Sequence, residues 1–333
     1  MALKEALALS CVRQITTRDD IDSVRKYVEG TDTPVAHVCD PAVFADVVFD
    51  RPAVLRAPAG RQKRTTIGLV VTRAGIFKDN GITFTEEDQR AFWVDTMKLL
   101  AERGYDYRLF TTGHFSDEVF LDRLVRAERI PLSKVAVTVN SPEELIGQLT
   151  ACDGVIAYRL HASITSFAFD IPSIGLSWNF KVPYFYESVG YGERALPPEQ
   201  WKAPVVVDAI EAAMAAGVTK DEAFHMSVYD TLFAGLKDIF RPELDRDPYT
   251  FAELQDELPR YTGTTLKQYQ GKARRKLRRI YEYYPTKAVQ QDPSMRAAAR
   301  QAYRRVRGID ISPVTARARQ AYQRVRGAVR GRH

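Results

Sequence analysis

The segment between residues 67 and 177 alternates short apolar runs with amphipathic stretches, and this alternation constrains the fold more than any other feature. Ile67–Thr72 is the clearest apolar run and is typical of a buried strand. Further strands are predicted at 107–111, 135–139, 154–158 and 173–177. Helices are predicted at 85–103, 116–128, from 141 onward and at 161–169. This order predicts an α/β domain, a parallel sheet with helices on both faces.

The first 55 residues show a shorter version of the same alternation. Helices are predicted at 3–10 and 18–27, and strands at 12–16 and 35–38. These elements are too few for a complete domain, so we interpret residues 1–55 as a partial αβ unit. A polar break at 50–64 precedes the larger domain, which we place at 63–240. Helices are expected there also at 206–216 and 220–239, followed by an irregular linker at 241–270.

The remaining residues, 271–333, form a basic tail. The chain has 333 residues and a net charge of +6. From Arg260 to the C-terminus it holds 20 Lys+Arg and 3 Asp+Glu, so the rest of the chain is acidic. The ten residues from Ala299 recur from Ala318 with nine identities. Helical spacing of apolar residues predicts basic amphipathic helices at 272–284, 295–307 and 315–329.

Three interpretations of this tail remain open. The helices could lie on an anionic membrane surface, near an acceptor that is a lipid-linked saccharide. Arg-rich helices also neutralise nucleic-acid phosphates, although we expect no nucleic-acid partner. The third interpretation is a solvated basic extension that docks on the acidic part of the chain.

The termini and the cysteines indicate the compartment. No stretch approaches the roughly 18 apolar residues of a membrane span. The charged pair Lys4-Glu5 interrupts the first apolar stretch, which is too short for a signal peptide. Cys11, Cys39 and Cys152 are widely spaced, so neither a disulfide framework nor a zinc site is indicated. We expect a cytoplasmic protein, which would be peripheral at the inner face of the membrane if the tail binds lipid.

The segment around residue 159 carries the clearest chemistry. A predicted strand ends at Tyr158 and a helix begins near His161. Ligands of open α/β sheets bind beyond the carboxyl ends of strands, where a helix N-terminus attracts anions. Arg159 offers a bidentate donor and His161 a proton near neutral pH. The alternative is structural, with Arg159 paired to a carboxylate such as Asp153 and His161 capping its own helix.

Several short motifs follow one another in an order that resembles the polysaccharide pyruvyl transferase family. They are Arg18-Asp19 with Ser23, Asp40-Pro41, Arg73 at a strand end, Arg159-Leu160-His161, and the trailing Lys181. The resemblance covers about residues 3–240. It implies two facing Rossmann-like domains similar to GT-B glycosyltransferases, of which residues 1–55 would be the remnant of the N-terminal one. It also implies transfer of an enolpyruvyl unit from phosphoenolpyruvate to a sugar, forming a cyclic ketal, with no further cofactor and no metal.

Phosphoenolpyruvate carries a phosphate and a carboxylate, so the reaction needs two cationic or N–H-rich pockets and a proton donor. We assign His161 as general acid/base or phosphate donor, and Arg159 and Arg73 as anion clamps. Lys181 would be a third cation, Leu160 would contact substrate, and His114 would line the cleft.

Other candidates are assigned structural roles. Arg18, with Asp19 and Ser23, is expected to fix the start of a helix. His37, within an apolar strand, is expected to be a core histidine.

The chain departs from the family in lacking a Gly-Asn-x-Gly-Asp segment near its start. The expectation is therefore a misplaced coding start, a partner chain that supplies the rest, or a degenerate fragment. Two alternative functions follow. One is a nucleotide-sugar glycosyltransferase of the same fold, although no Glu-x₇-Glu signature is evident. The other is a non-catalytic subunit that completes a partner and tethers it through the tail.

Overall fold

The computed structural model describes residues 2–49 and 64–291. The chain divides into two compact units, Met1–Tyr269 and Gln270–His333, which are described separately below. The domain boundaries expected at 55, 63 and 240 stay predictions. The helices expected at 295–307 and 315–329 lie outside the described residues.

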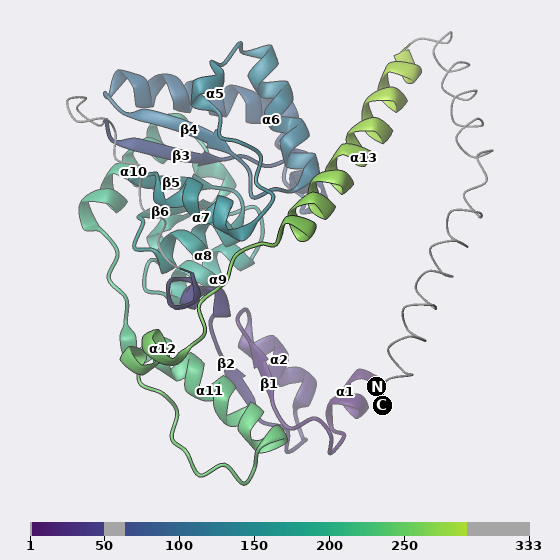
Figure 1. Ribbon diagram of the computed structural model, residues 1–333, viewed down its shortest axis with the longest axis vertical. Coiled ribbons are helices and arrows are strands. Elements are labelled where there is room, and N and C mark those ends of the chain that lie inside the picture. Colours follow the sequence, from purple (N-terminus) through teal and green to yellow (C-terminus); the bar gives the residue numbers. More distant parts are fainter. Residues whose placement is uncertain (1, 50–63, 292–333) are drawn as a thin grey trace, which may run out of the picture. The chain divides into compact units, whose positions relative to one another are not determined.

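A five-stranded parallel sheet forms the centre of the first unit, as the alternation predicts (Figure 1). Its strands are β3 (Thr66–Val70), β4 (Asp106–Phe110), β5 (Gly154–Ala157), β6 (Ser173–Leu176) and β7 (Ala195–Leu196). Their spatial order is β4-β3-β5-β6-β7. The chain order therefore reverses between β3 and β5, and at such a switch point a crevice opens beyond the carboxyl ends of the strands.

The strand predicted at 135–139 is wrong. Only a single parallel bridge forms there, between Leu109 and Val135. The amide of Ala136 donates to the Leu109 carbonyl at 2.8 Å. β4 ends at Phe110, one residue after Leu109, and the chain then turns, with the Gly113 amide donating to Thr111 Oγ1. The rest of the segment 135–139 therefore lies beyond the end of β4 and does not pair with it. The bridge places Val135 on the outer side of the edge strand β4. With it, the spatial order of the chain segments approaches that of a Rossmann sheet.

Helices cover both faces of the sheet because alternate strand residues feed two apolar cores. On one side, Ile67 and Leu69 pack with α5 (Glu86–Glu102), α6 (Phe115–Ala127) and α10 (Ala203–Ala216). On the other side, Val70 packs with α7 (Pro142–Thr150) and α8 (Leu160–Ala168). Strands buried on both faces are the hallmark of parallel sheets.

Several elements were not expected from the sequence. They are α4 (Gly75–Asp79), α9 (Lys181–Ser188), β7 and the short 3₁₀ turns Pro41–Phe44, Leu132–Lys134, Gly192–Arg194 and Pro198–Gln200. α11 spans Glu222–Phe240, close to the prediction. The linker expected to be irregular contains α12 (Phe251–Glu257), whose start is closed by a capping box between Thr250 and Glu253.

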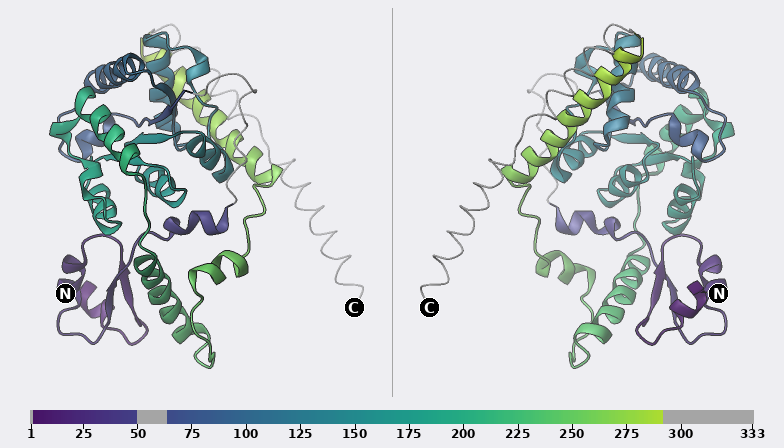
Figure 2. Two further views of the ribbon diagram at one scale, coloured as in Figure 1. Left: turned by 90° about the vertical axis from the view of Figure 1, so that its left-hand side faces the viewer. Right: turned by 90° about the vertical axis from the view of Figure 1, so that its right-hand side faces the viewer.

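The N-terminal residues form α1 (Ala2–Leu7), β1 (Ile15–Thr17), α2 (Ile21–Val28), β2 (Val35–His37) and α3 (Ala45–Val48). β1 and β2 pair in parallel as a separate two-stranded sheet. Val38 and Val43 anchor this segment to α8, α9 and α11 in a third apolar cluster. α11 lies beside the two strands (Figure 2).

The expectation that His37 is a core histidine is wrong, because its side chain is exposed. Val38, the residue after the strand, is buried instead.

α13 (Leu266–Gln291) begins at the end of the first unit and supplies the described part of the second. It includes residues 272–284, which were expected to be helical. Among the described residues, no helix is long and apolar enough to span a bilayer.

Candidate active site

Arg159 makes a bidentate ion pair at the carboxyl end of β5. It occupies the N-cap position of α8, and its Nε and Nη2 each lie 2.7 Å from an oxygen of Asp117. Asp117 belongs to the first turn of α6 and its side chain is fully buried. The structural alternative, in which Arg159 pairs with a carboxylate, is confirmed, but the partner is Asp117 and not Asp153, whose Oδ2 accepts the Thr66 amide at 2.8 Å.

Asp117 also binds the end of β3. Its Oδ1 accepts Thr72 Oγ1 at 3.2 Å and the Arg73 amide at 3.1 Å. One buried carboxylate thus ties together the carboxyl ends of β3 and β5, at the switch point of the sheet. His114 joins the same group, with Nδ1 3.8 Å from Asp117 Oδ1. Within residues 2–49 and 64–291, the guanidinium of Arg73 forms no ion pair.

A second charged group gathers where β1 and β2 end against α8 and α9. Arg18 follows β1, Asp40 follows β2, and the two form an ion pair. His161 Nε2 lies 4.0 Å from Asp40 Oδ2, and its side chain is 65% exposed. Lys181, the first residue of α9, lines a small cavity together with Arg18 and Asp40. The cavity of about 10 Å³ could hold about one water molecule.

The electrostatic field at His161 is positive. Partial burial and the charges of Arg18, Lys181 and Arg159 lower the pKa of this histidine below its ordinary value of 6.5. The imidazole is therefore mostly neutral at pH 7. No side chain caps α8, so the suggestion that His161 caps its own helix is wrong. The exposed ring keeps its Nε2 beside the Asp40 carboxylate.

Arg18, Asp40 and Asp117 were missed as site residues. Arg18 was expected to fix the start of α2 together with Asp19 and Ser23. Ser23 does take part, because its amide and its hydroxyl both donate to Asp20, the residue that caps α2. The expectation is wrong for Arg18, whose ion-pair partners are Asp19 and Asp40. Position could have revealed Arg18 and Asp40, because Arg18 directly follows β1 and Asp40 lies three residues after the end of β2, and the carboxyl ends of parallel strands meet at one edge. Nothing in the sequence marks Asp117.

Leu160 and Lys181 lie next to the second charged group, the one around Arg18 and Asp40. Leu160 is half-buried against the apolar cluster that anchors β2. The Lys181 ammonium lies 5.9 Å from the centre of the Phe180 ring. His161, Leu160 and Lys181 therefore share the second group, whereas Arg73, His114 and Arg159 share the first. Arg159 and His161 are two residues apart, so the two groups adjoin at the start of α8.

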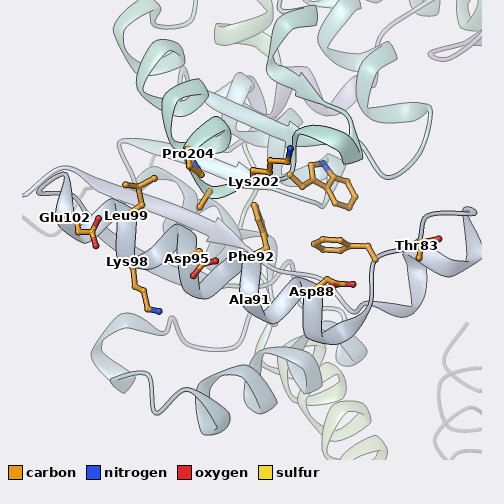
Figure 3. Close-up of a pocket in the computed structure, with 13 residues that line it drawn as sticks. Thr83, Asp88, Ala91, Phe92, Asp95, Lys98, Leu99, Glu102, Lys202 and Pro204 are labelled. Carbon is orange, nitrogen blue, oxygen red and sulfur yellow. The ribbon is translucent and has the colours of Figure 1, made fainter.

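A larger groove of about 770 Å³ lies elsewhere, between α5 and the start of α10 (Figure 3). Phe84, Phe92 and Trp201 form its apolar wall, and Asp88 and Asp95 lie along its edge. It contains none of the predicted site residues. Across the part of the chain that the structure describes, no cluster of three His, Cys, Asp or Glu side chains could hold a metal ion.

The fold and these groups define an α/β protein in which two groups of charged side chains lie beyond the carboxyl ends of parallel strands, where proteins of this class bind ligands. The family model of polysaccharide pyruvyl transferases matches residues 3–179. Because this match spans more than half of the chain, the protein belongs to the polysaccharide pyruvyl transferase family, which is a family of transferases. A search of curated proteins finds no match.

Proposed function

We propose that the protein transfers a pyruvyl group from phosphoenolpyruvate to a sugar of a cell-surface or extracellular polysaccharide, forming a pyruvate ketal. Family membership supports the transferase class. The observation that carries the proposal is the gathering of Arg18, Arg159 and Lys181 around His161. A donor with both a phosphate and a carboxylate needs this density of positive charge.

Arg159 would hold the donor through its Nη1, because Asp117 occupies Nε and Nη2. Asp117 is then a positioning residue, which fixes the guanidinium plane without touching substrate. Arg73 lies at the neighbouring strand end and would bind the second anionic group. The phosphate would lie at the start of α8, where Lys181 and the helix dipole favour negative charge.

The chemistry requires one proton donor and one proton acceptor. A proton is added to the methylene carbon of phosphoenolpyruvate, and a sugar hydroxyl attacks the resulting cationic carbon. A second hydroxyl of the same sugar then displaces phosphate from that carbon and closes the ketal. The two hydroxyl protons leave with the phosphate and with the general base, so the base regenerates the acid.

His161 is our candidate for this acid and base. Without ligand its lowered pKa keeps the ring neutral at pH 7. Binding of a multiply charged anion beside it would raise the pKa, since a nearby negative charge favours the imidazolium. Binding of the donor would thus protonate His161, and His161 would then give this proton to the methylene carbon of the donor. General acid–base groups typically contribute about 10²–10⁴-fold in rate.

We also propose that β1 and β2 belong to a second Rossmann-like half, as in GT-B enzymes. The placement of Arg18 and Asp40 against α8 and α9 supports this, because ligands of GT-B enzymes bind between two such halves. Phosphoenolpyruvate is a cytoplasmic metabolite, so the proposal places the reaction in the cytoplasm.

The test measures binding and turnover separately. Phosphoenolpyruvate should raise the melting temperature of the chain, and His161→Ala or Arg159→Ala should abolish that shift. Arg126→Gln removes an exposed arginine of α6 and serves as the control, which should bind normally. Phosphate release in the presence of acceptor polysaccharide should be lost in the same two variants.

Three outcomes would overturn the proposal. Unchanged phosphate release in both variants of an active preparation would remove His161 and Arg159 from the reaction. Stabilisation by a nucleoside diphosphate, with none by phosphoenolpyruvate, would favour a glycosyltransferase. Binding of the donor without turnover would indicate a non-catalytic subunit.

A further inference from the structure

α13 exposes a line of large apolar side chains, which a helix in water normally buries. Leu266, Leu277, Ile280 and Tyr281 are all exposed, and Tyr281 reaches 74% exposure. At about 100° per residue these positions fall on one stripe, about a third of the helix circumference. α13 is drawn as one continuous helix in Figure 1.

The rest of the helix surface is strongly basic. Seven Lys and Arg and a single Glu lie between Leu266 and Tyr283. The exposed arginines form two adjacent pairs, Arg274-Arg275 and Arg278-Arg279. Positive charge therefore flanks the apolar stripe along several turns.

Neither charge nor apolarity alone explains this surface. A nucleic acid would neutralise the arginines but leave Leu277, Ile280 and Tyr281 in water. A coiled coil needs apolar spacing sustained over at least about three heptads, and here the spacing spans about two. A basic face beside an apolar face is the pattern of helices that lie in the interface of an anionic bilayer.

We propose that α13 is a membrane-interface helix that binds anionic phospholipids. The apolar stripe enters the boundary between head groups and acyl chains, and the arginines contact the lipid phosphates. This association is parallel to the bilayer plane. It is independent of the proposed transferase activity, because it uses no residue of the candidate active site.

The test uses the full chain with vesicles of phosphatidylcholine, with and without phosphatidylglycerol. We expect sedimentation with the anionic vesicles only, and weaker binding as salt is raised. Replacing Leu277, Ile280 and Tyr281 together by Gln should reduce the partition coefficient by about tenfold or more. Circular dichroism checks that this triple variant keeps its helix content.

α11 offers a matched control. Leu236, Ile239 and Phe240 have the same spacing as the α13 triple and are also exposed. Their replacement by Gln should leave vesicle binding unchanged. A second variant, Arg274→Gln with Arg278→Gln, should weaken binding to anionic vesicles.

Three results would overturn the assignment. One is equal sedimentation with both vesicle types. Another is unchanged binding by the α13 triple variant, which would place any membrane contact elsewhere in the chain. The last is binding to single-stranded RNA, but not to vesicles, that depends on the arginines and not on the apolar triple.

Discussion

At the scale of single residues, Asp117 holds together the residues that follow β3 and β5. This buried carboxylate receives two hydrogen bonds from Arg159, one from Thr72 and one from the Arg73 amide. A charge taken out of water is tolerated only when it is paired and bonded in this way. The orientation of the Arg159 guanidinium therefore depends on Asp117.

Asp117→Asn tests this dependence. The amide keeps the shape of the side chain but leaves the Arg159 guanidinium without its counter-charge, so we expect the free energy of unfolding to fall by about 2–4 kcal/mol. Urea denaturation measures it. Asp122→Asn breaks the exposed pair with Arg126 on the same helix and should cost less than about 1 kcal/mol. Equal effects in the two variants would contradict the role of Asp117.

The pKa of His161 gives a second prediction. NMR titration should find this pKa below 6.5, and Lys181→Gln should raise it because one repelling cation is removed. Since folding lowers the pKa, the unfolded chain binds the proton more tightly. The free energy of unfolding should therefore decrease as pH falls through 6.5 toward the folded-state value. His161→Asn should flatten this slope. A pKa at or above the ordinary value would rule out the positive field.

At the scale of elements, helices approach the sheet closely where strands carry glycine. Gly175 of β6 has no side chain, and a Cβ placed there would lie 2.5 Å from the Tyr186 ring and 2.6 Å from Val182. Both neighbours belong to α9 and are buried. The position of α9, and with it that of Lys181, thus depends on the absence of one methyl group.

Gly175→Ala should push α9 away and lower the free energy of unfolding by about 1–3 kcal/mol. Gly147→Ala is the matched control. It lies within α7 with open space around it, so alanine should stabilise the helix by about 0.5–1 kcal/mol. Thermal melts of both variants show whether each substitution raises or lowers the stability of the fold. A neutral Gly175→Ala variant would show that α9 packs more loosely than the structure describes.

At the scale of the first unit, Lys220 links segments far apart in the sequence. Its ammonium lies 2.9 Å from Asp46 of α3, 3.1 Å from Asp170 and 2.6 Å from the Ala168 carbonyl. It therefore connects the N-terminal segment with the loop after α8. A half-buried cation with three acceptors is difficult to replace by water.

Lys220→Met keeps the apolar stem and removes the charge. We expect a loss of about 1–2 kcal/mol in the free energy of unfolding. Amides of α3 should exchange faster with deuterium, while those of β3 and β5 stay protected. Uniformly faster exchange would indicate global destabilisation instead of a released N-terminal segment.

The sequence by itself determined the α/β class, because buried parallel strands impose long apolar runs with helices between them. It also indicated Arg159 and His161, since a helix that starts after a strand marks the ligand edge. It could not reveal that Asp117 pairs with Arg159, nor that Arg18 and Asp40 lie beside His161. Only the tertiary structure decided these contacts, because strand order and helix docking bring together side chains from segments far apart in the chain.

The same reason explains the failed strand at 135–139 and the unexpected α9. Local apolarity predicted a strand, but a strand exists only where a neighbour offers partners, and β4 turns away too soon. In an element as short as α9, apolar spacing is a weak sequence signal for a helix. Packing against Gly175, and not helix propensity, therefore determines where α9 forms. For α13 the sequence was sufficient to predict the helix, because the spacing of apolar residues in an amphipathic helix can be read directly from the sequence. The structure added which of its apolar side chains are exposed.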